Sequence, residues 1–360
     1  MDDESDLPTE PAVANGPADP QAAAGSTQFT PFIVPHRETQ IQLLPTTPLL
    51  LFQSFIPVSM VERWVEYTNE APGPVGPFQK KSRKNEWRPT SVAEVYLWLA
   101  LMIYMGIHRE TRYKDHWSTS PGKPVHPIVQ VMTYDRFEQL LRRLRLCNAK
   151  NTKKSPYDRV DEWSRHVQQA STRYYNPGDT IAVDECMIRF TGRSKETVTI
   201  RTKPTPTGFK IWVVAQAGYF LRWLWATADT AAAATAAAAR PRAGRREKPE
   251  TRKRDIDNPP ALTPTANVVV ALLKLLPTQT YHVFMDNLFS SPDLFFILRH
   301  IGIAATGTAR ANCGLFERLI KAKKDDEKGI CWAYNQLLAI PTPDGQVRDL
   351  TDSPPYIVQY

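Results

Sequence analysis

The segment TIAVDECMIRF, residues 180–190, is rich in β-branched and other apolar side chains and predicts a strand. Two acidic residues, Asp184 and Glu185, stand near the end of its apolar part. A carboxylate buried without a partner is costly, so packing does not explain Asp184. Because successive residues of a strand point to opposite faces, Glu185 is expected on the face opposite Asp184. The segment therefore predicts a strand that carries Asp184 into a site.

The segments on both sides of this strand predict a mixed α/β fold. Further strand-like runs stand at residues 197–202, 209–218, 219–227 and 280–286, and the close succession of the first ones favours antiparallel pairing. Helices are expected where apolar periodicity follows a capping residue, at Ser59, Ser91, Thr133 and Ser291, and also at residues 160–175 and 265–276.

Composition divides the chain into three parts. Residues 1–45 are rich in proline, alanine and acidic residues and are expected to be disordered. Residues 46–178 are expected to form a helical region, and residues 179–360 the domain that contains the sheet. Within that domain, residues 226–262 are alanine-rich and then strongly basic, which indicates a low-complexity insert.

The charge of the chain favours a polyanionic partner. The net charge is +8, but residues 1–36 contain six acidic residues and no lysine or arginine. The remaining residues therefore carry +14, the sum of 8 and 6. Such a distribution is typical of a protein that binds nucleic acid. Nucleic acid is the expected partner, and no small-molecule substrate is expected.

The four cysteines and the apolar segments restrict the class of protein further. Cys147, Cys186, Cys313 and Cys331 form no CxxC pair, so neither a structural zinc site nor a disulfide framework is expected. The most apolar stretch, residues 92–107, contains Glu94 and is too short to span a bilayer. We expect a buried helix there, no membrane partner and no secretory signal, in a reducing intracellular compartment.

Asp184 and Asp286 are the candidate site residues, because each stands near the end of an expected strand. Two carboxylates brought close together repel one another unless a cation lies between them. Mg²⁺ prefers carboxylate oxygens as protein ligands, and its other coordination positions are filled by water and by substrate phosphates. A plainer alternative remains open: an aspartate before an asparagine and a helix is often a turn or cap residue, and the acidic pair at 184–185 can simply face water.

Several motifs in one order resemble the piggyBac transposase family. The first half of the family pattern reads Asp184, Glu185, Met187, Phe190, Gly192, Arg193, Lys203, Pro204, Gly208 and Lys210. The second half reads Asp286, Asn287, Phe289, Ser290, Ser291, Ala305, Thr306, Gly307, Thr308 and Arg310. The resemblance covers residues 47–358 apart from the insert.

This resemblance implies a ribonuclease H-like catalytic domain flanked by helical DNA-binding and dimerisation segments. It also implies cut-and-paste DNA transposition with Mg²⁺ held by three aspartates, of which Asp184 is the first and Asp286 the second. The family's third aspartate lies in a Gly-Val-Asp context that these 360 residues do not contain. Asp344, Asp349 and Asp352 are not expected to replace it. The chain is therefore expected to be C-terminally truncated, with impaired catalysis and weakened Mg²⁺ binding.

DNA binding depends on many separate charges and is expected to persist without catalysis. The helix after Thr133 is expected to present an arginine face that includes Arg136, and the runs at 80–84 and 150–154 are further candidates. The candidate DNA contacts are Arg142, Arg143, Arg145, Arg193, Lys203 and Lys210. The basic run at 240–254 suggests nuclear localisation. The resulting hypothesis is a transposase-derived protein, whether enzyme or remnant. Its alternative is a non-catalytic DNA-binding or dimerisation module that forms a homodimer.

Overall fold

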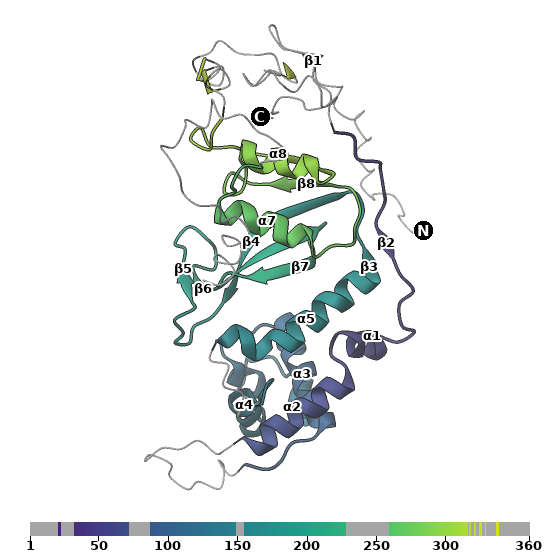
Figure 1. The fold of residues 1–360 in the computed structure, drawn as a ribbon. Coiled ribbons are helices and arrows are strands. Elements are labelled where there is room, and N and C mark those ends of the chain that lie inside the picture. The colour runs from purple at the N-terminus through teal and green to yellow at the C-terminus, as the bar shows by residue number, and fades with distance from the viewer. Residues whose placement is uncertain are drawn as a thin grey trace, which may run out of the picture. The chain divides into compact units, whose positions relative to one another are not determined.

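The computed structural model describes residues 32–71, 87–148, 155–227 and 259–315, with a few more positions at 21–22, 336–337 and between 317 and 328. Most of the expected tail and of the expected insert lies outside these residues, as do the basic runs at 80–84, 150–154 and 240–254. The chain divides into two compact units (Figure 1). The sheet unit comprises residues 1–40, 177–193 and 197–360, and the helical unit comprises residues 41–176 and 194–196.

A mixed sheet forms the centre of the sheet unit. Its strands are β4 (Thr180–Arg189), β5 (Val198–Thr199), β6 (Thr207–Gln216), β7 (Tyr219–Trp225), β8 (Tyr281–Met285) and β9 (Ile303–Gly307). The strand order is β5-β6-β4-β8-β9, and β7 also pairs with β6. β6 pairs with β4, β5 and β7 in antiparallel orientation, as predicted. β8 pairs with β4 and β9 in parallel orientation. The short strands β1 (Gln21–Ala22) and β10 (Gln336–Leu337) pair separately.

The antiparallel part of the sheet is closed by a two-residue turn between β6 and β7. Ala217 and Gly218 both have positive φ, 47° and 79°. A hairpin turn of this hand matches the right-handed twist of the strands that it joins. Glycine adopts positive φ without cost, but alanine does not, so Ala217 is strained in this turn.

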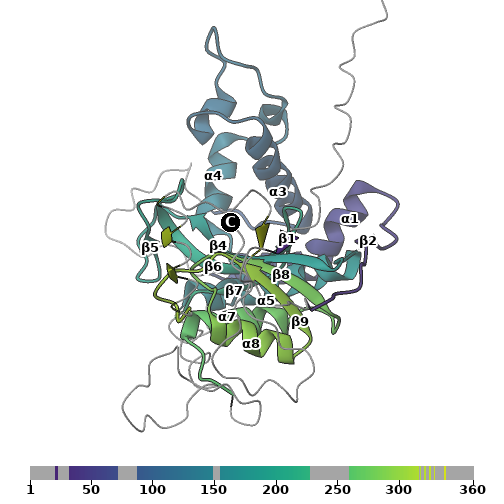
Figure 2. The same cartoon turned by 90° about the horizontal axis from the view of Figure 1, so that it is seen from above.

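Two helices cover one face of the sheet (Figures 1 and 2). α7 (Pro264–Leu273) is capped by Thr263, and α8 (Pro292–His300) by Ser291, as predicted for the latter. Proline at the first helical position suits both, because the missing N–H would have no helical partner there. Ile181, Val183 and Val283 are at most 2% exposed, since they belong to this covered face. Ala182 and Phe284 alternate with them and are exposed on the other face.

Residues 32–39 belong to the sheet unit, so the expected tail of residues 1–45 extends too far. The Arg37 guanidinium donates hydrogen bonds to the carbonyls of Pro177, Gly178 and Thr280. The Arg37 N–H donates to Asp179 Oδ2, and the Arg37 carbonyl accepts from the Asp179 N–H. This ordered segment joins the residues that precede β4 to the residue that precedes β8. Arg37 thus provides hydrogen bonds to the segments before β4 and β8, and the composition of residues 1–45 gave no sign of this role.

The helical unit consists of short helices around apolar clusters. Its helices are α1 (Pro48–Phe55), α2 (Val58–Glu70), α3 (Val92–Ile107), η2 (Tyr113–Trp117), η3 (Pro127–Gln130), α4 (Tyr134–Arg143) and α5 (Pro156–Tyr174). Two-residue strands β2 (Gln40–Ile41) and β3 (Tyr175–Asn176) pair with one another. None of the helices in the described part of the chain is long and apolar enough to cross a membrane.

Of the three caps predicted in the helical unit, two are confirmed. Ser91 and Thr133 accept from the N–H groups of Glu94 and Arg136, as predicted. Ser59 does not cap α2, because this helix begins at Val58, two residues earlier than expected, with Pro57 at the N-cap. α3 is buried on one side against α2 and α4 through Val95, Trp98 and other apolar residues.

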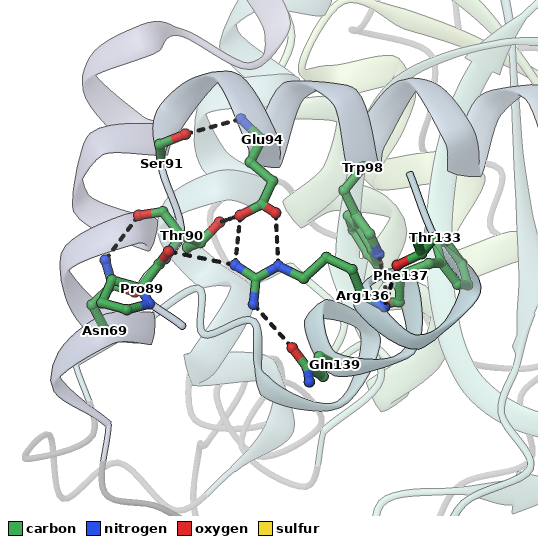
Figure 3. Close-up of polar contacts among 10 residues, drawn as sticks. All are labelled: Asn69, Pro89, Thr90, Ser91, Glu94, Trp98, Thr133, Arg136, Phe137 and Gln139. Atoms are coloured by element: carbon green, nitrogen blue, oxygen red, sulfur yellow. Dashed lines mark hydrogen bonds and ion pairs between the residues drawn. The ribbon is translucent and has the colours of Figure 1, made fainter. Parts of the chain in front are cut away.

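Arg136 is not on an exposed arginine face, which corrects the prediction for α4. Its side chain is 5% exposed and forms a bidentate ion pair with Glu94 on α3 (Figure 3). The Nε–Oε1 distance is 2.7 Å and the Nη2–Oε2 distance is 2.6 Å. Thr90 also donates to Glu94, and the hydrogen bond from Arg136 holds the pKa of Glu94 below its usual value although burial opposes this. Arg136 therefore joins α4 to α3 instead of facing DNA.

Candidate functional site

The candidate site lies where the pairing between the parallel strands β4 and β8 ends, five residues before the end of β4 and at the end of β8. β4 and β8 pair in register from Thr180 with His282 to Val183 with Met285. Asp184 and Asp286 are the next residues on the two chains, one step beyond the last pair. Since adjacent strands lie roughly 4.8 Å apart, this register brings the two aspartates close together. Both are exposed, and alternation places both on the face opposite α7 and α8.

The Asp184 carboxylate is oriented by the strand that carries it. Its Oδ1 accepts a hydrogen bond of 2.7 Å from the backbone N–H of Glu185. Across the sheet, Asp184 lies opposite Val213 of β6, which is 4% exposed. The backbone at Asp184 is therefore fixed by the ladder with β6, while the carboxylate remains accessible.

The Asp286 carboxylate is oriented by a turn between β8 and α8. Its Oδ1 accepts a hydrogen bond of 2.8 Å from the N–H of Leu288. Its backbone carbonyl accepts from the N–H of Phe289 at 3.3 Å and from the Ser290 hydroxyl at 2.9 Å. Ser290 is 3% exposed, so this hydrogen bond is shielded from water. Asp286 is thus a turn residue, as the plainer alternative stated. A turn residue can also hold a metal ion through its second carboxylate oxygen.

Close packing behind the turn restricts it further. A Cβ atom on Gly307 of β9 would lie 2.3 Å from Ser290 Oγ and 2.5 Å from the Met285 carbonyl oxygen. Only glycine therefore lets β9 approach this turn. Asn287, next to Asp286, accepts a hydrogen bond of 3.1 Å from Nε of Arg310. This contact places a guanidinium group beside the turn.

Glu185 lies on the other face from Asp184 and is paired there. Its carboxylate is 13% exposed and contacts the ammonium groups of Lys210 and Lys203, the latter at 3.4 Å. Burial raises the pKa of Glu185, but the two lysines outweigh burial and the net pKa is lowered. The Lys210 ammonium also lies 4.0 Å from the centre of the Trp212 ring. The family motifs contain Glu185, Lys203 and Lys210, but their mutual contact was not deduced from sequence.

The candidate DNA contacts differ in how available they are. Arg142 is 69% exposed beside Glu138, and Arg145 and Arg193 are exposed. The Arg143 guanidinium lies 4.5 Å from the Trp87 ring centre and donates to the Ala71 carbonyl. Lys203 and Lys210 are engaged by Glu185, as described above. Arg142, Arg145 and Arg193 are thus exposed, although Arg142 also pairs with Glu138, whereas Arg143, Lys203 and Lys210 are less exposed.

The two aspartates offer a donor set that suits a hard divalent cation. Carboxylate oxygens are the protein ligands that Mg²⁺ prefers. Each aspartate uses Oδ1 for a backbone N–H, which fixes the orientation of the other oxygen. Two carboxylates are a small donor set, and among the described residues no group of three or more His, Cys, Asp or Glu side chains could hold a metal ion. The arrangement fits a metal that draws further ligands from water or substrate.

Comparisons with known proteins support the origin suggested by the motifs. The family model described as transposase IS4 matches residues 47–335. PiggyBac transposable element-derived protein 2 of Homo sapiens is 23% identical over 282 residues, which are 77% of this chain and 42% of that protein. The chain therefore spans less than half of that relative.

One solved structure has a similar fold. It is a piggyBac transposase in a synaptic complex with hairpin DNA, with a TM-score of 0.58 and 20% sequence identity. The match covers 77% of this chain and 54% of the solved chain. At this identity the likeness concerns the fold, which is the ribonuclease H-like transposase fold, as predicted.

Proposed function

Because this chain belongs to the transposase IS4 family and, by its relatives, to the piggyBac transposases, we propose that it is a transposase-derived DNA-binding protein with the first two carboxylates of a divalent-metal site. The register that places Asp184 beside Asp286 carries this proposal. Two exposed carboxylates on adjacent strands repel one another, and a cation between them relieves that repulsion. Packing against the rest of the sheet unit does not require either carboxylate.

Mg²⁺ is the proposed cofactor, with Asp184 and Asp286 as its protein ligands. When bound, it would supply Lewis-acid stabilisation of a phosphodiester and of the leaving oxygen. The protein's own contribution is orientation: the hydrogen bonds to Glu185 N–H and Leu288 N–H fix both carboxylates before metal arrives. Such preorganisation matters because small displacements of ligands weaken a metal site.

We further propose that the 360-residue polypeptide binds DNA more readily than it cleaves DNA. Two carboxylates hold Mg²⁺ weakly and fix its position less well than three. DNA binding instead depends on separate cations, and Arg142, Arg145 and Arg193 are exposed to provide them. The similarity to a transposase solved with hairpin DNA supports DNA as the partner. A non-catalytic DNA-binding or dimerisation module is the second candidate function.

DNA binding and cleavage can be tested together with one labelled hairpin duplex. We expect its fluorescence anisotropy to rise with protein at low salt and to fall steeply as salt increases. Arg193→Ala should lower the slope of log K against log salt by about 1, whereas Lys210→Ala, which removes an already paired cation, should change it less. Absence of binding at low salt would refute the proposal.

Cleavage distinguishes the two candidate functions. If the site is active, Mg²⁺ or Mn²⁺ produces nicks that Asp184→Asn abolishes. If the chain is the non-catalytic module, the same protein binds the duplex and leaves it intact. Equal nicking by the wild type and by Asp184→Asn would show that the two aspartates are not the site.

Nuclear localisation and homodimer formation complete the proposal. The run at 240–254 contains eight basic residues in fifteen, a composition typical of nuclear import signals. A fluorescent fusion should therefore enter the nucleus and lose this property when the run is replaced by glycine and serine. Light scattering should give twice the chain mass, and a monomer at all concentrations would refute the dimer.

A further inference from the structure

Glu185 has contacts that neither metal binding nor DNA binding requires. It is adjacent to Asp184 but faces the covered side of the sheet, where Lys203 and Lys210 contact its carboxylate. Lys203 comes from the loop between β5 and β6, and Lys210 from β6. The carboxylate therefore joins β4 to two neighbouring segments immediately behind Asp184.

The contacts continue from Glu185 to the second aspartate. The Lys210 ammonium lies on Trp212, and the Trp212 ring meets Phe289 edge-to-face with ring centres 5.6 Å apart. Phe289 is 2% exposed, and its N–H donates to the carbonyl of Asp286. A continuous path of contacts thus runs behind the sheet from the residue next to Asp184 to the backbone of Asp286.

We propose that Glu185 is a positioning residue, which fixes the part of β4 that carries Asp184 relative to the β8–α8 turn and so sets the spacing of Asp184 and Asp286. The effect of Glu185 on metal binding rests on the proposed function, in which Asp184 and Asp286 hold a divalent metal. The coupling between Glu185 and the turn does not rest on it. Two lysines on one carboxylate restrain it from two directions. A single exposed ion pair, in contrast, contributes little to order.

Glu185→Gln is the most direct variant, because it keeps the shape of the side chain and removes its charge. The matched control is Glu66→Gln, the same change on the exposed side of α2 in the helical unit. The probe is Mn²⁺, which takes carboxylate and water ligands and is measured by electron paramagnetic resonance. We expect Glu185→Gln to weaken Mn²⁺ binding about tenfold, as for residues that orient metal ligands, and Glu66→Gln to leave it unchanged. Equal Mn²⁺ affinity of Glu185→Gln and the wild type would refute the proposed effect of Glu185 on metal binding.

A second readout needs no metal. Amide hydrogen exchange in metal-free protein reports local opening of the turn. We expect the N–H groups of Leu288, Phe289 and Ser290 to exchange several times faster in Glu185→Gln than in Glu66→Gln. Unchanged exchange at these amides would overturn the inference. Faster exchange in a protein whose wild type binds no Mn²⁺ would support the coupling and refute the metal site instead.

Lys210→Gln provides the second variant should Glu185→Gln fail to fold. It removes the cation that lies between Glu185 and Trp212 but leaves Lys203 in place. Exchange at the same three amides should increase in the same direction and by a smaller factor. If this variant folds and its turn amides exchange as in the wild type, the path through Lys210 is refuted.

Discussion

Asp184 and Asp286 occupy the same step of two adjacent parallel strands, one residue beyond the paired residues Val183 and Met285. They are 102 positions apart in the chain, since 286 minus 184 is 102. The neighbouring positions of the two residues are therefore a property of the β4–β8 register. A shift of this register by one residue would also turn one of the two carboxylates toward the opposite face.

The first prediction concerns cooperation between the two aspartates. Asp184→Asn and Asp286→Asn should each weaken Mn²⁺ binding by about tenfold or more, because each removes one charged ligand. The double variant should bind little more weakly than either single one, since residues that form one site are not additive. Isothermal titration calorimetry measures all three. Full additivity would indicate that the aspartates do not share a cation.

The second prediction concerns the turn that carries Asp286. Gly307→Ala should lower the free energy of unfolding by about 1 to 3 kcal/mol, because the new methyl group meets a backbone oxygen that cannot easily move. Gly106→Ala is the control: outside its own helix backbone and chain neighbours, no atom lies within 4 Å of its added Cβ, and alanine suits a helix. This control should stabilise the protein or leave it unchanged. Urea unfolding checks both, and equal effects would contradict the close approach of β9.

The third prediction concerns the ion pair between α3 and α4. Arg136→Met should cost about 2 to 3 kcal/mol, somewhat less than for fully buried pairs, because Glu94 remains 25% exposed. Arg142→Met removes the exposed pair with Glu138 on the same helix and should cost at most about 0.5 kcal/mol. Denaturant unfolding at neutral pH separates the two variants. Similar losses would show that the burial of Arg136 does not matter.

The same ion pair predicts a dependence of stability on pH. The folded-state pKa of Glu94 is lowered, chiefly by the hydrogen bond from Arg136. Its contribution is therefore complete above the unfolded-state pKa of about 4.3 and is lost as pH falls through the lower folded-state value. The free energy of unfolding should decrease less steeply below about pH 5 in Arg136→Met than in the wild type. Identical slopes would contradict this assignment.

The fourth prediction uses the strained turn between β6 and β7. Ala217→Asn should stabilise the protein by roughly 0.5 to 1 kcal/mol, because asparagine tolerates positive φ better than alanine does. Thermal unfolding measures this difference. A loss of stability would show that the Ala217 conformation carries no strain.

Local sequence predicted much of the fold because its signals act over a few residues. Ser91, Thr133 and Ser291 cap helices since the partner N–H lies only three residues ahead. The alternation in residues 180–190 likewise placed Asp184 and Glu185 on opposite faces. Ser59 failed as a cap because the helix already begins at Val58, after Pro57.

The partners of charged side chains could not be predicted in this way. Arg136 belongs to a helix whose sequence suggests an exposed basic face, yet Glu94 on another helix makes its burial favourable. Arg37 stands in a segment of low-complexity composition but finds three carbonyls near the start of β4 and β8. In both cases the stabilising partner is distant in sequence, and composition holds no information about it.

The sequence by itself determined the longer strands, the caps Ser91, Thr133 and Ser291, the excess of positive charge and the family of this protein. Only the tertiary structure decided that Asp184 and Asp286 lie side by side and that Glu185 is held by two lysines behind them. The reason is physical: strand and cap preferences depend on neighbouring residues, whereas register depends on the simultaneous packing of β4, β6, β8 and α8 against one another.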